Sequence, residues 1–295
     1  MSRAAPRFTV VLANYNGAAY LREAVDSILA QSLDDWHLVV VDDGSTDDSC
    51  EVLQALLMPL GERAALHRHA HNLGQGPAFN TALKNIESSW TAFIDSDDRW
   101  HPDKLKAVAE ALASQKAPPA ILQHPLRLVD HTQPSSRIFP EYAITGDVLS
   151  WMRARRRLPK CAPTSGLVFN TEMLRQVLPV PDPFRVCADG FLTRTAACFG
   201  TVAVLDKVLA DYRIHPDNHV EGNRAFEGQR FEREVMIPAL NAFFATHQID
   251  LTLDLPAVES APRSSSRPMS WLPRGWVNRW RRGPQAHLFR AKPPK

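Results

Sequence analysis

Residues 37–48 read HLVVVDDGSTDD, an apolar and β-branched run that ends in paired carboxylates and a turn. A continuous apolar run of this kind is typical of a strand that is buried on both faces, as in a parallel sheet. The DDGS segment supplies the turn, and Ser45 is predicted to cap the helix that carries Val52 and Leu56. The stretch therefore predicts a strand, a polar loop and a helix in direct succession.

The same pattern occurs on both sides of this stretch. Buried strands are predicted at Phe8–Ala13, Ala64–His67 and Thr91–Ile94, and apolar residues at helical spacing follow each strand. Strands that alternate with helices form a parallel sheet with helices on both faces. The fold is therefore predicted to be α/β, with a Rossmann-like, mostly parallel sheet.

The pattern becomes mixed after Pro118-Pro119, so residues 1–250 are expected to form one domain with halves at about 1–117 and 118–250. A linker and a basic tail are expected at 251–295, where Pro, Ser and Arg dominate. In the second half, strands are predicted at Ile121–Val129, Gly166–Phe169 and Val208–Ile214, and helices at Val148–Met152 (capped by Thr145), Asp189–Phe199 and Phe226–Phe244 (kinked at Pro238).

The charge of the chain is unevenly distributed. The 295 residues carry a formal net charge of +2, but residues 260–295 hold nine of the 34 Lys and Arg and no acidic residue. The rest carries −7, from 25 basic and 32 acidic residues. A basic tail on an acidic body favours contact with a membrane surface or nucleic acid.

The composition excludes several classes of protein. With 44% hydrophobic and 22% charged residues, the body can bury a core, which argues against wholesale disorder. No apolar stretch reaches the ~18–20 residues of a membrane span, and the N-terminal segment lacks the apolar region of a signal peptide. The four cysteines form no CxxC pair, so we expect reduced, cytosolic thiols.

Three predicted strands end in polar clusters, which are Asn14-Tyr15-Asn16, Asp42-Asp43 and Asp95-Ser96-Asp97-Asp98. Ligands of such sheets bind beyond the carboxyl ends of the strands, so the site is expected there. No GxGxxG or Walker glycine cradle follows the first strand, and Gly74-Gln75-Gly76 is only a weak match. Carboxylates two residues apart suit Mg²⁺ or Mn²⁺, whereas the alternative is a turn and helix cap before Pro102.

Six stretches follow one another between about 8 and 220 in a specific order. Together they resemble the family-two glycosyltransferases of the GT-A fold, and the ordered set is far more specific than any one member. The stretches are Val10–Asp48, Asn72–Leu83 (NLGQGPAFNTAL), Ala92–Leu105 (AFIDSDDRWHPDKL), Pro163–Asn170 (PTSGLVFN), Ala188-Asp189 and Tyr212–Asn218 (YRIHPDN).

The resemblance implies a nucleotide-sugar donor, with a UDP-sugar foremost, and a Mn²⁺ or Mg²⁺ cofactor. It assigns Tyr15 to stacking on the nucleobase, Asp43 to the ring N–H, and Asp189 to the base that activates the acceptor. Asn16 and Asn72 belong to the expected donor site. The expected metal ligands are Asp95, Asp97, which also lies at the ribose, Asp98 and His215.

The chain departs from the family pattern at three positions. Ala13 stands where many members have Pro or Thr, and Phe79 stands where an Arg commonly precedes the Asn of the third motif. Ala188 replaces the Glu that often precedes the base. Local alternatives also remain: Tyr15 as a core aromatic, Asp43 as a turn residue, Asp189 as a helix N-cap, and His215 as a phosphate contact or a turn histidine before Pro216.

The implied reaction is a single displacement with inversion. A divalent cation stabilises the departing diphosphate, and a carboxylate takes the proton of the acceptor hydroxyl. The acceptor is expected to be a carbohydrate or a lipid-linked molecule of the cell envelope. The alternatives are a non-catalytic scaffold on a degenerate GT-A fold, a nucleotidyltransferase and, with least support, a carbohydrate hydrolase.

The tail has an amphipathic pattern over Trp271–Arg282. Leu272, Trp276 and Trp280 recur at helical spacing, with arginines mostly opposite. Tryptophans and arginines on opposite sides favour an anionic membrane interface, while docking on the body or on a partner remains open. We therefore expect a cytoplasmic protein, peripheral at the inner face of the cytoplasmic membrane, with no role in nucleic-acid binding.

Overall fold

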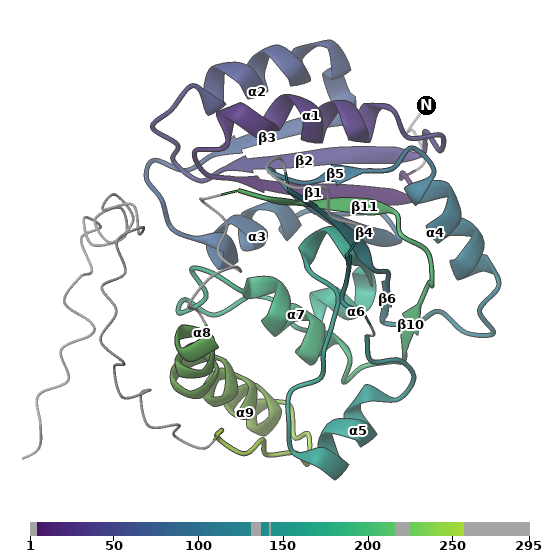
Figure 1. Cartoon of the computed structure of the whole chain (residues 1–295), viewed down its shortest axis with the longest axis vertical. Coiled ribbons are helices and arrows are strands. Elements are labelled where there is room, and N and C mark those ends of the chain that lie inside the picture. The colour runs from purple at the N-terminus through teal and green to yellow at the C-terminus, as the bar shows by residue number, and fades with distance from the viewer. Residues whose placement is uncertain (1–4, 131–136, 142, 216–224, 257–295) are drawn as a thin grey trace, which may run out of the picture. The chain divides into compact units, whose positions relative to one another are not determined.

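The computed structural model describes residues 5–130, 137–141, 143–215 and 225–256, which contain two β-sheets and the helices around them (Figure 1). Within these residues, no helix combines the length and apolar character needed to cross a membrane. The helices are α1 (Ala18–Leu29), α2 (Ser49–Leu57), α3 (Gln75–Leu83), α4 (Lys104–Ala113), α5 (Val148–Arg155), α6 (Thr171–Arg175), α7 (Ala188–Ala196), α8 (Ala225–Phe231) and α9 (Ile237–Thr246), with shorter helical turns η1 (Met58–Arg63), η2 (Thr164–Gly166) and η3 (Glu232–Met236).

The larger sheet has seven strands in the order β10-β6-β9-β4-β1-β2-β3. All neighbouring pairs are parallel except those of β9, which runs antiparallel to β4 and β6. The mostly parallel α/β sheet predicted from the alternation is therefore confirmed. The strands are β1 (Phe8–Asn14), β2 (Trp36–Asp42), β3 (Ala64–Arg68), β4 (Trp90–Asp95), β6 (Ile121–Gln123), β9 (Leu167–Asn170) and β10 (Val202–Val204).

A second, four-stranded sheet has the order β5 (Arg99–Trp100), β11 (Ala210–Ile214), β7 (Leu126–Asp130) and β8 (Ile138–Phe139). The prediction of one strand over Ile121–Val129 is wrong, because this segment divides into β6 and β7 in different sheets. His124-Pro125 separates them, and a proline has no N–H for a sheet ladder. The strands of the second half are thus divided between two sheets, and the hydrophobic pattern of the sequence does not reveal this division.

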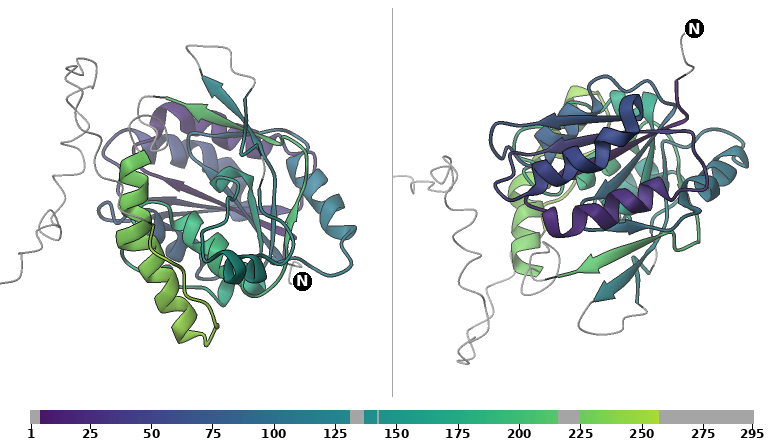
Figure 2. Two further views of the ribbon diagram at one scale, coloured as in Figure 1. Left: turned by 60° about the horizontal axis from the view of Figure 1, so that its bottom comes forward. Right: turned by 90° about the horizontal axis from the view of Figure 1, so that it is seen from above.

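Buried side chains alternate along the central strands and form a core on each face of the large sheet. Val10 and Leu12 of β1 belong to one cluster and Val11 to the other, as the two-residue period of a strand requires. Helices α1, α2 and α4 pack on the first face, and α3, α7 and α9 contribute to the second. Figure 2 shows α1 and α2 side by side on their face of the sheet.

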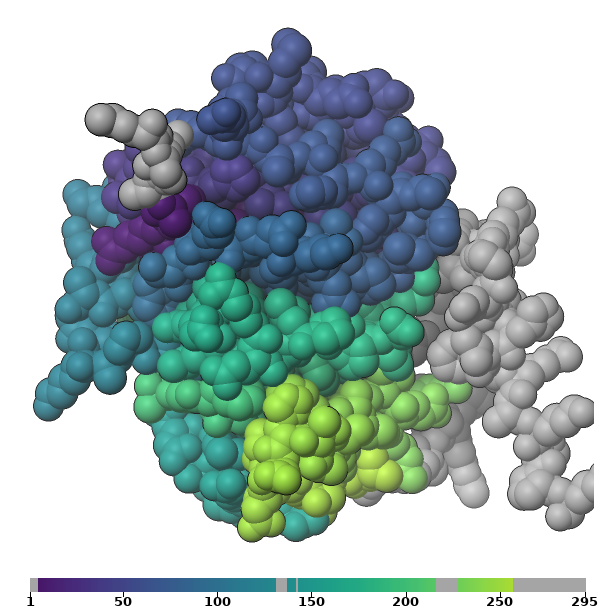
Figure 3. Space-filling model, turned by 180° about the vertical axis from the view of Figure 1, so that it is seen from behind, coloured from purple at the N-terminus to yellow at the C-terminus, as the bar shows by residue number. Residues whose placement is uncertain are grey.

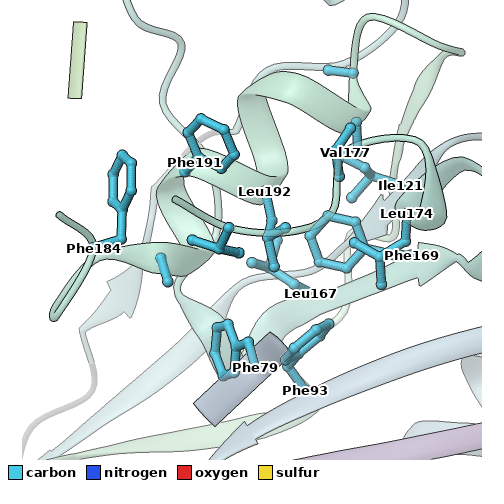
Figure 4. Close-up of a cluster of buried hydrophobic side chains, with 14 of the residues drawn as sticks. Phe79, Phe93, Ile121, Leu167, Phe169, Leu174, Val177, Phe184, Phe191 and Leu192 are labelled. Atoms are coloured by element: carbon cyan, nitrogen blue, oxygen red, sulfur yellow. The ribbon is translucent and has the colours of Figure 1, made fainter. Parts of the chain in front are cut away.

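The core of the second face is rich in phenylalanine (Figure 4). The rings of Phe79 and Phe93 lie 4.8 Å apart edge to face, and Phe169 continues the contact at 5.4 Å from Phe93. Such pairs stabilise beyond the area that they bury. Phe79, which stands where the family commonly has Arg, is therefore a core residue, with 1% of its surface exposed.

Two predicted helix caps are wrong. Helix α2 begins at Ser49, and the Ser45 hydroxyl donates instead to Asp42. The N-cap of α5 is Asp147, which accepts from Ser150 N at 2.9 Å, whereas the Thr145 hydroxyl donates to Val202 O. Both errors arise because several polar residues precede each helix, and tertiary contacts decide which of them caps it.

The predicted helix over Phe226–Phe244 is divided by a π-helical turn, η3, which separates α8 from α9, and Pro238 follows this turn at the start of α9. A proline lacks the N–H of a regular helix, and π turns accommodate such disruptions.

Leu251 and Leu253 are buried in the core, so the fold continues past 250 into the predicted linker. Figure 3 shows the blue surface of the first half adjoining the teal and yellow surface of the second.

Candidate active site at the carboxyl edge of the sheet

Parallel pairing brings the ends of β1, β2 and β4 to one edge of the sheet. Asn14 is paired in register with Asp42, and Ala13 with Asp95. Asp42 is fully buried and accepts from Asn14 Nδ2 at 2.9 Å and from Ser45 N at 3.2 Å. These bonds make Asp42 a structural residue that joins the first two strand ends.

Asp43 lies beside this junction and is 3% exposed. Its Oδ2 accepts from Gly74 N at 2.7 Å, and its Oδ1 accepts from Leu73 N at 3.0 Å and lies 2.7 Å from His69 Nδ1. A carboxylate offers about four acceptor positions, so three protein partners leave one for a ligand. The predicted nucleobase contact is therefore compatible with a carboxylate that also holds the loop after β3.

Asn16 and Tyr15 follow β1 at the same edge. Asn16 has a positive φ of 53°, and its Oδ1 accepts from Thr46 N at 2.8 Å and from Asp47 N at 3.3 Å. Its amide oxygen thus fixes the turn after β2. Tyr15 is half-buried, which is compatible with the predicted stacking.

The glycines of Gly74-Gln75-Gly76 allow close packing rather than a phosphate cradle. Gly74 has a positive φ of 104°, and a Cβ there would lie 2.5 Å from the Cα of Arg185. A Cβ at Gly76 would lie 2.7 Å from Phe184 O. The loop that begins at Asn72 is therefore pressed against residues 184–185 of the second half.

Three carboxylates converge where β4 ends. Ligand oxygens of Asp95, Asp97 and Asp98 all lie within 4.8 Å of one another. His215 Nε2 lies 2.9 Å from Asp97 Oδ2, and the His215 ring stacks on Tyr20 with centroids 4.6 Å apart. The structure thus brings together three of the four side chains proposed as metal ligands, and the fourth, His215, contacts Asp97.

The electrostatics of this cluster suit a cation. Burial raises the pKa of Asp95 well above its ordinary value, and the charges of Asp98, Asp97 and Asp189 raise it further. Burial and the charge of Asp97 do the same for Asp98. Asp98 Oδ1 accepts from Arg213 N at 3.0 Å, whereas Oδ2 is buried with no hydrogen-bond partner among the described residues. An unpartnered carboxylate oxygen beside two others is the donor set that Mg²⁺ and Mn²⁺ prefer.

Lys104, which is fully buried, lies close to Asp98 of this cluster. Lys104 Nζ donates to Ser165 O and lies 3.8 Å from the ring centroid of Trp100. Burial lowers the pKa of Lys104, while the charge of Asp98 opposes that shift. The sequence pattern gives no sign of this residue, because a lysine in the first turn of a helix is ordinarily exposed.

Asp189 is half-buried in the first turn of α7, close to the cluster. Burial raises its pKa, and hydrogen bonding by the Thr164 hydroxyl opposes the rise at both Asp189 and Asp95. The residue at the N-cap position is Cys187, so Asp189 is not the N-cap. Ala188 is fully buried and its N–H donates to Gln75 Oε1 at 2.8 Å, so a Glu at that position would place a further carboxylate in the interior.

The chain is similar to known proteins in sequence and in fold. The family model of glycosyl transferase family 2 matches residues 9–160. An uncharacterized glycosyltransferase of Nostoc sp. (strain PCC 7120) is 33% identical over 244 residues, which are 80% of this chain and 74% of that protein. TuaG of Bacillus subtilis (strain 168), named for teichuronic acid biosynthesis, is 31% identical over 142 residues, 48% of this chain and 56% of that protein.

Two solved structures share the fold. TarS of S. aureus in complex with UDP-GlcNAc has a TM-score of 0.59 and 21% identity, over 81% of this chain and 73% of that one. The mannosyltransferase PcManGT of Pyrobaculum calidifontis, in complex with GDP-Man and Mn²⁺, has a TM-score of 0.55 and 20% identity, over 85% of this chain and 66% of that one. The chain therefore belongs to glycosyl transferase family 2 and is a glycosyltransferase with the GT-A fold.

Proposed function

We propose that this glycosyltransferase moves a sugar from a nucleoside-diphosphate donor to an acceptor hydroxyl, with a divalent cation and with inversion at the anomeric carbon. The observation that carries the proposal is the cluster of Asp95, Asp97 and Asp98 at the carboxyl edge of the sheet, with Asp189 nearby. Three acidic groups at this spacing repel one another unless a cation offsets them.

Asp95, Asp97 and Asp98 would hold Mn²⁺ or Mg²⁺, and His215, which directly follows β11, would complete the site. The oxygen donors fit the cation, and the buried, unpartnered Oδ2 of Asp98 is an observation in its favour. When bound, the cation acts as a Lewis acid that stabilises negative charge on the leaving diphosphate. No side chain is then needed to protonate the leaving group.

Asp189 would act as the general base. An acceptor hydroxyl has a pKa far above 7, so a carboxylate within hydrogen-bond reach must take its proton during attack. The raised pKa of Asp189 moves this carboxylate toward the operating pH, where a base is most effective. One base and one stabilised leaving group on opposite sides of the anomeric carbon produce single displacement and inversion.

Tyr15, Asn16, Asp43, Asn72 and Asp97 would bind the donor, for which we propose a UDP-sugar first. The fold neighbours are solved with UDP-GlcNAc and with GDP-Man, which supports a nucleoside-diphosphate sugar. The name of TuaG supports an acceptor in cell-envelope polysaccharide or glycolipid synthesis. We further propose that the protein works at the inner face of the cytoplasmic membrane through Trp271–Arg282, which lie outside the described residues.

A thermal-shift screen of UDP, GDP, CDP and their sugars, with and without Mn²⁺, tests the proposal. A ligand at 100 times its Kd stabilises a protein by about 2.7 kcal/mol, which such a screen detects. We expect a shift that requires both a nucleotide and Mn²⁺ and that Asp97→Asn abolishes. The absence of any metal-dependent shift would favour a scaffold on a degenerate fold.

A further inference from the structure

Two segments that lie far apart in the chain are bonded along one loop. Gln75 N donates to Arg185 O at 2.9 Å, and Gly76 N donates to Phe184 O at 2.7 Å. Arg185 Nη2 donates to Asn72 O at 2.9 Å and to Asn72 Oδ1 at 2.6 Å. The second half therefore places one guanidinium directly on the loop that Asp43 holds from the other side.

Arg185 and Asp43 bind the same peptide unit. The carbonyl of Asn72 accepts from Arg185, and the N–H of Leu73 in that peptide donates to Asp43 Oδ1 at 3.0 Å. One side of the unit thus carries a carboxylate that accepts, and the other side carries a guanidinium that donates. The loop thus carries both a hydrogen-bond acceptor and a hydrogen-bond donor.

The guanidinium has capacity for such a ligand. Arg185 is exposed, and among the described residues the hydrogen bonds of its side chain all use Nη2 and all go to Asn72. No acidic side chain of the described part of the chain lies within ion-pair distance of it, whereas other arginines of this edge, such as Arg68 and Arg213, are paired. Its Nε and Nη1 remain as donors in a fixed, planar arrangement.

Helix α3 supplies no cation to this loop, because Phe79 is buried in the core against Phe93. The positive charge beside Asn72 comes from a residue more than a hundred positions away. The bonds at Gln75 and Gly76 fix the backbone of Arg185, so the guanidinium is held on the loop at low entropic cost.

We propose that Arg185 is a specificity-determining residue that donates a hydrogen bond to a ring carbonyl of the donor nucleobase, while Asp43 accepts from the neighbouring ring N–H. This inference rests on the proposed function and on the predicted role of Asp43. Uracil and guanine present a ring N–H next to a carbonyl. Cytosine and adenine present a ring nitrogen that accepts, which would face the carboxylate of Asp43 without a hydrogen.

The test compares the full-length wild type with Arg185→Ala and Arg185→Lys. Calorimetric titration with UDP, GDP, CDP and inorganic pyrophosphate, each with Mn²⁺, measures the affinities. Arg185→Ala should weaken the binding of UDP or of GDP, whichever the wild type prefers, by about tenfold or more. This is the loss of affinity expected when one charge-assisted hydrogen bond is removed. Arg185→Lys keeps the charge but loses the planar fork, so an intermediate loss is expected.

Pyrophosphate affinity should stay unchanged in both variants, because the proposed contact is with the base. Arg157→Ala, at an exposed arginine outside this loop, is the matched control. Unchanged UDP and GDP affinity in Arg185→Ala, or an equal loss for the nucleotides and pyrophosphate, would overturn the proposal. A wild type that binds no nucleotide at all would instead refute the proposed function.

Discussion

His69 Nδ1 lies 2.7 Å from Asp43 Oδ1, and His69 Nε2 lies 2.8 Å from the Thr81 hydroxyl. The imidazole therefore links the carboxylate at the end of β2 to helix α3, and both the His69 and the Asp43 side chains are largely buried. A histidine between a carboxylate and a hydroxyl fixes the direction of the carboxylate oxygens. His69 is therefore a positioning residue for Asp43.

Replacing His69 by Ala should raise the donor KM by about five- to tenfold, as expected for one lost hydrogen bond, with kcat nearly unchanged. Asp43 would keep its bonds from Leu73 and Gly74 but lose its third partner. Thr81→Val should act in the same direction with a smaller effect. Steady-state kinetics with His67→Ala, at an exposed neighbour, as control would check this; a fall in kcat at constant KM would contradict it.

Replacing Asp189 by Asn should reduce the transfer rate by about 10²–10⁴-fold, because the amide cannot take the acceptor proton. Donor binding should persist, since Asp189 lies on α7 and not on the nucleotide loops. A transfer assay together with the Mn²⁺-dependent nucleotide shift separates the two effects. Asp182→Asn changes an exposed carboxylate of the preceding loop and should have no effect. Near wild-type transfer by Asp189→Asn would remove the base assignment.

Metal binding should depend on pH. Burial and mutual repulsion raise the pKa of Asp95 and Asp98, and a carboxylate must be deprotonated to bind a cation. The Mn²⁺-induced thermal shift should therefore be larger at about pH 8 than at about pH 5. Without metal, the stability of the fold should have the opposite pH dependence. The folded state binds the protons of Asp95 and Asp98 more tightly than the unfolded state, so the free energy of unfolding increases as the pH falls through the raised pKa values. A metal shift that is independent of pH would contradict the assignment.

Asp211 joins three strands of the second sheet. Its carboxylate lies 2.6 Å from Arg99 Nη2, 2.9 Å from His101 Nε2 and 2.8 Å from Arg127 Nη2, and is 3% exposed. Burial alone would raise the pKa of Asp211, but hydrogen bonds from His101 and Arg99, with the charge of His101 and a further bond from Arg127, hold it well below its ordinary value. Asp211→Asn should therefore lower the free energy of unfolding at neutral pH by about 1–3 kcal/mol.

The stabilisation by Asp211 should also depend on pH. A carboxylate whose pKa is lowered by folding stabilises the fold fully at a pH above its pKa in the unfolded chain, which is about 3.9. This stabilisation is lost as the pH falls below that value toward the pKa of the folded state. The difference in the free energy of unfolding between the wild type and Asp211→Asn should thus become smaller below about pH 4. Urea unfolding over a pH series measures it, with Asp206→Asn, at an exposed neighbour, as control. A constant difference down to low pH would argue against the ion-pair network.

The basic tail supports a separate prediction. Deletion of residues 260–295 removes nine positive charges and the tryptophans of Trp271–Arg282. Binding to vesicles with anionic lipid should fall strongly, since each basic residue near such a surface contributes about 1 kcal/mol. Co-sedimentation of the full-length and shortened proteins with anionic and neutral vesicles makes the comparison. Equal binding of both forms to anionic vesicles would exclude the membrane role.

The amino-acid sequence by itself determined the repeated strand–helix pattern and the polar residues at the strand ends. The apolar runs of β1, β2 and β4 can only be buried on both faces, and parallel pairing then brings their carboxyl ends to one edge. For this reason the sequence alone predicts Asp43, Asp95 and Asp97 at a common edge. The spacing of Asp95, Asp97 and Asp98 likewise places three carboxylates within reach of one another.

Only the tertiary structure decided the contacts that cross the two halves. Lys104, Thr164 and Arg185 belong to no local pattern, because their partners in the other half lie far away in the chain and depend on how the second half packs against the first. His69 meets Asp43 within the first half, but the two residues are 26 positions apart, so no local pattern reveals that contact either. The second sheet and the division at His124-Pro125 escaped prediction for the same reason. Hydrophobic periodicity specifies which face of an element is buried, whereas long-range packing specifies which polar groups meet there.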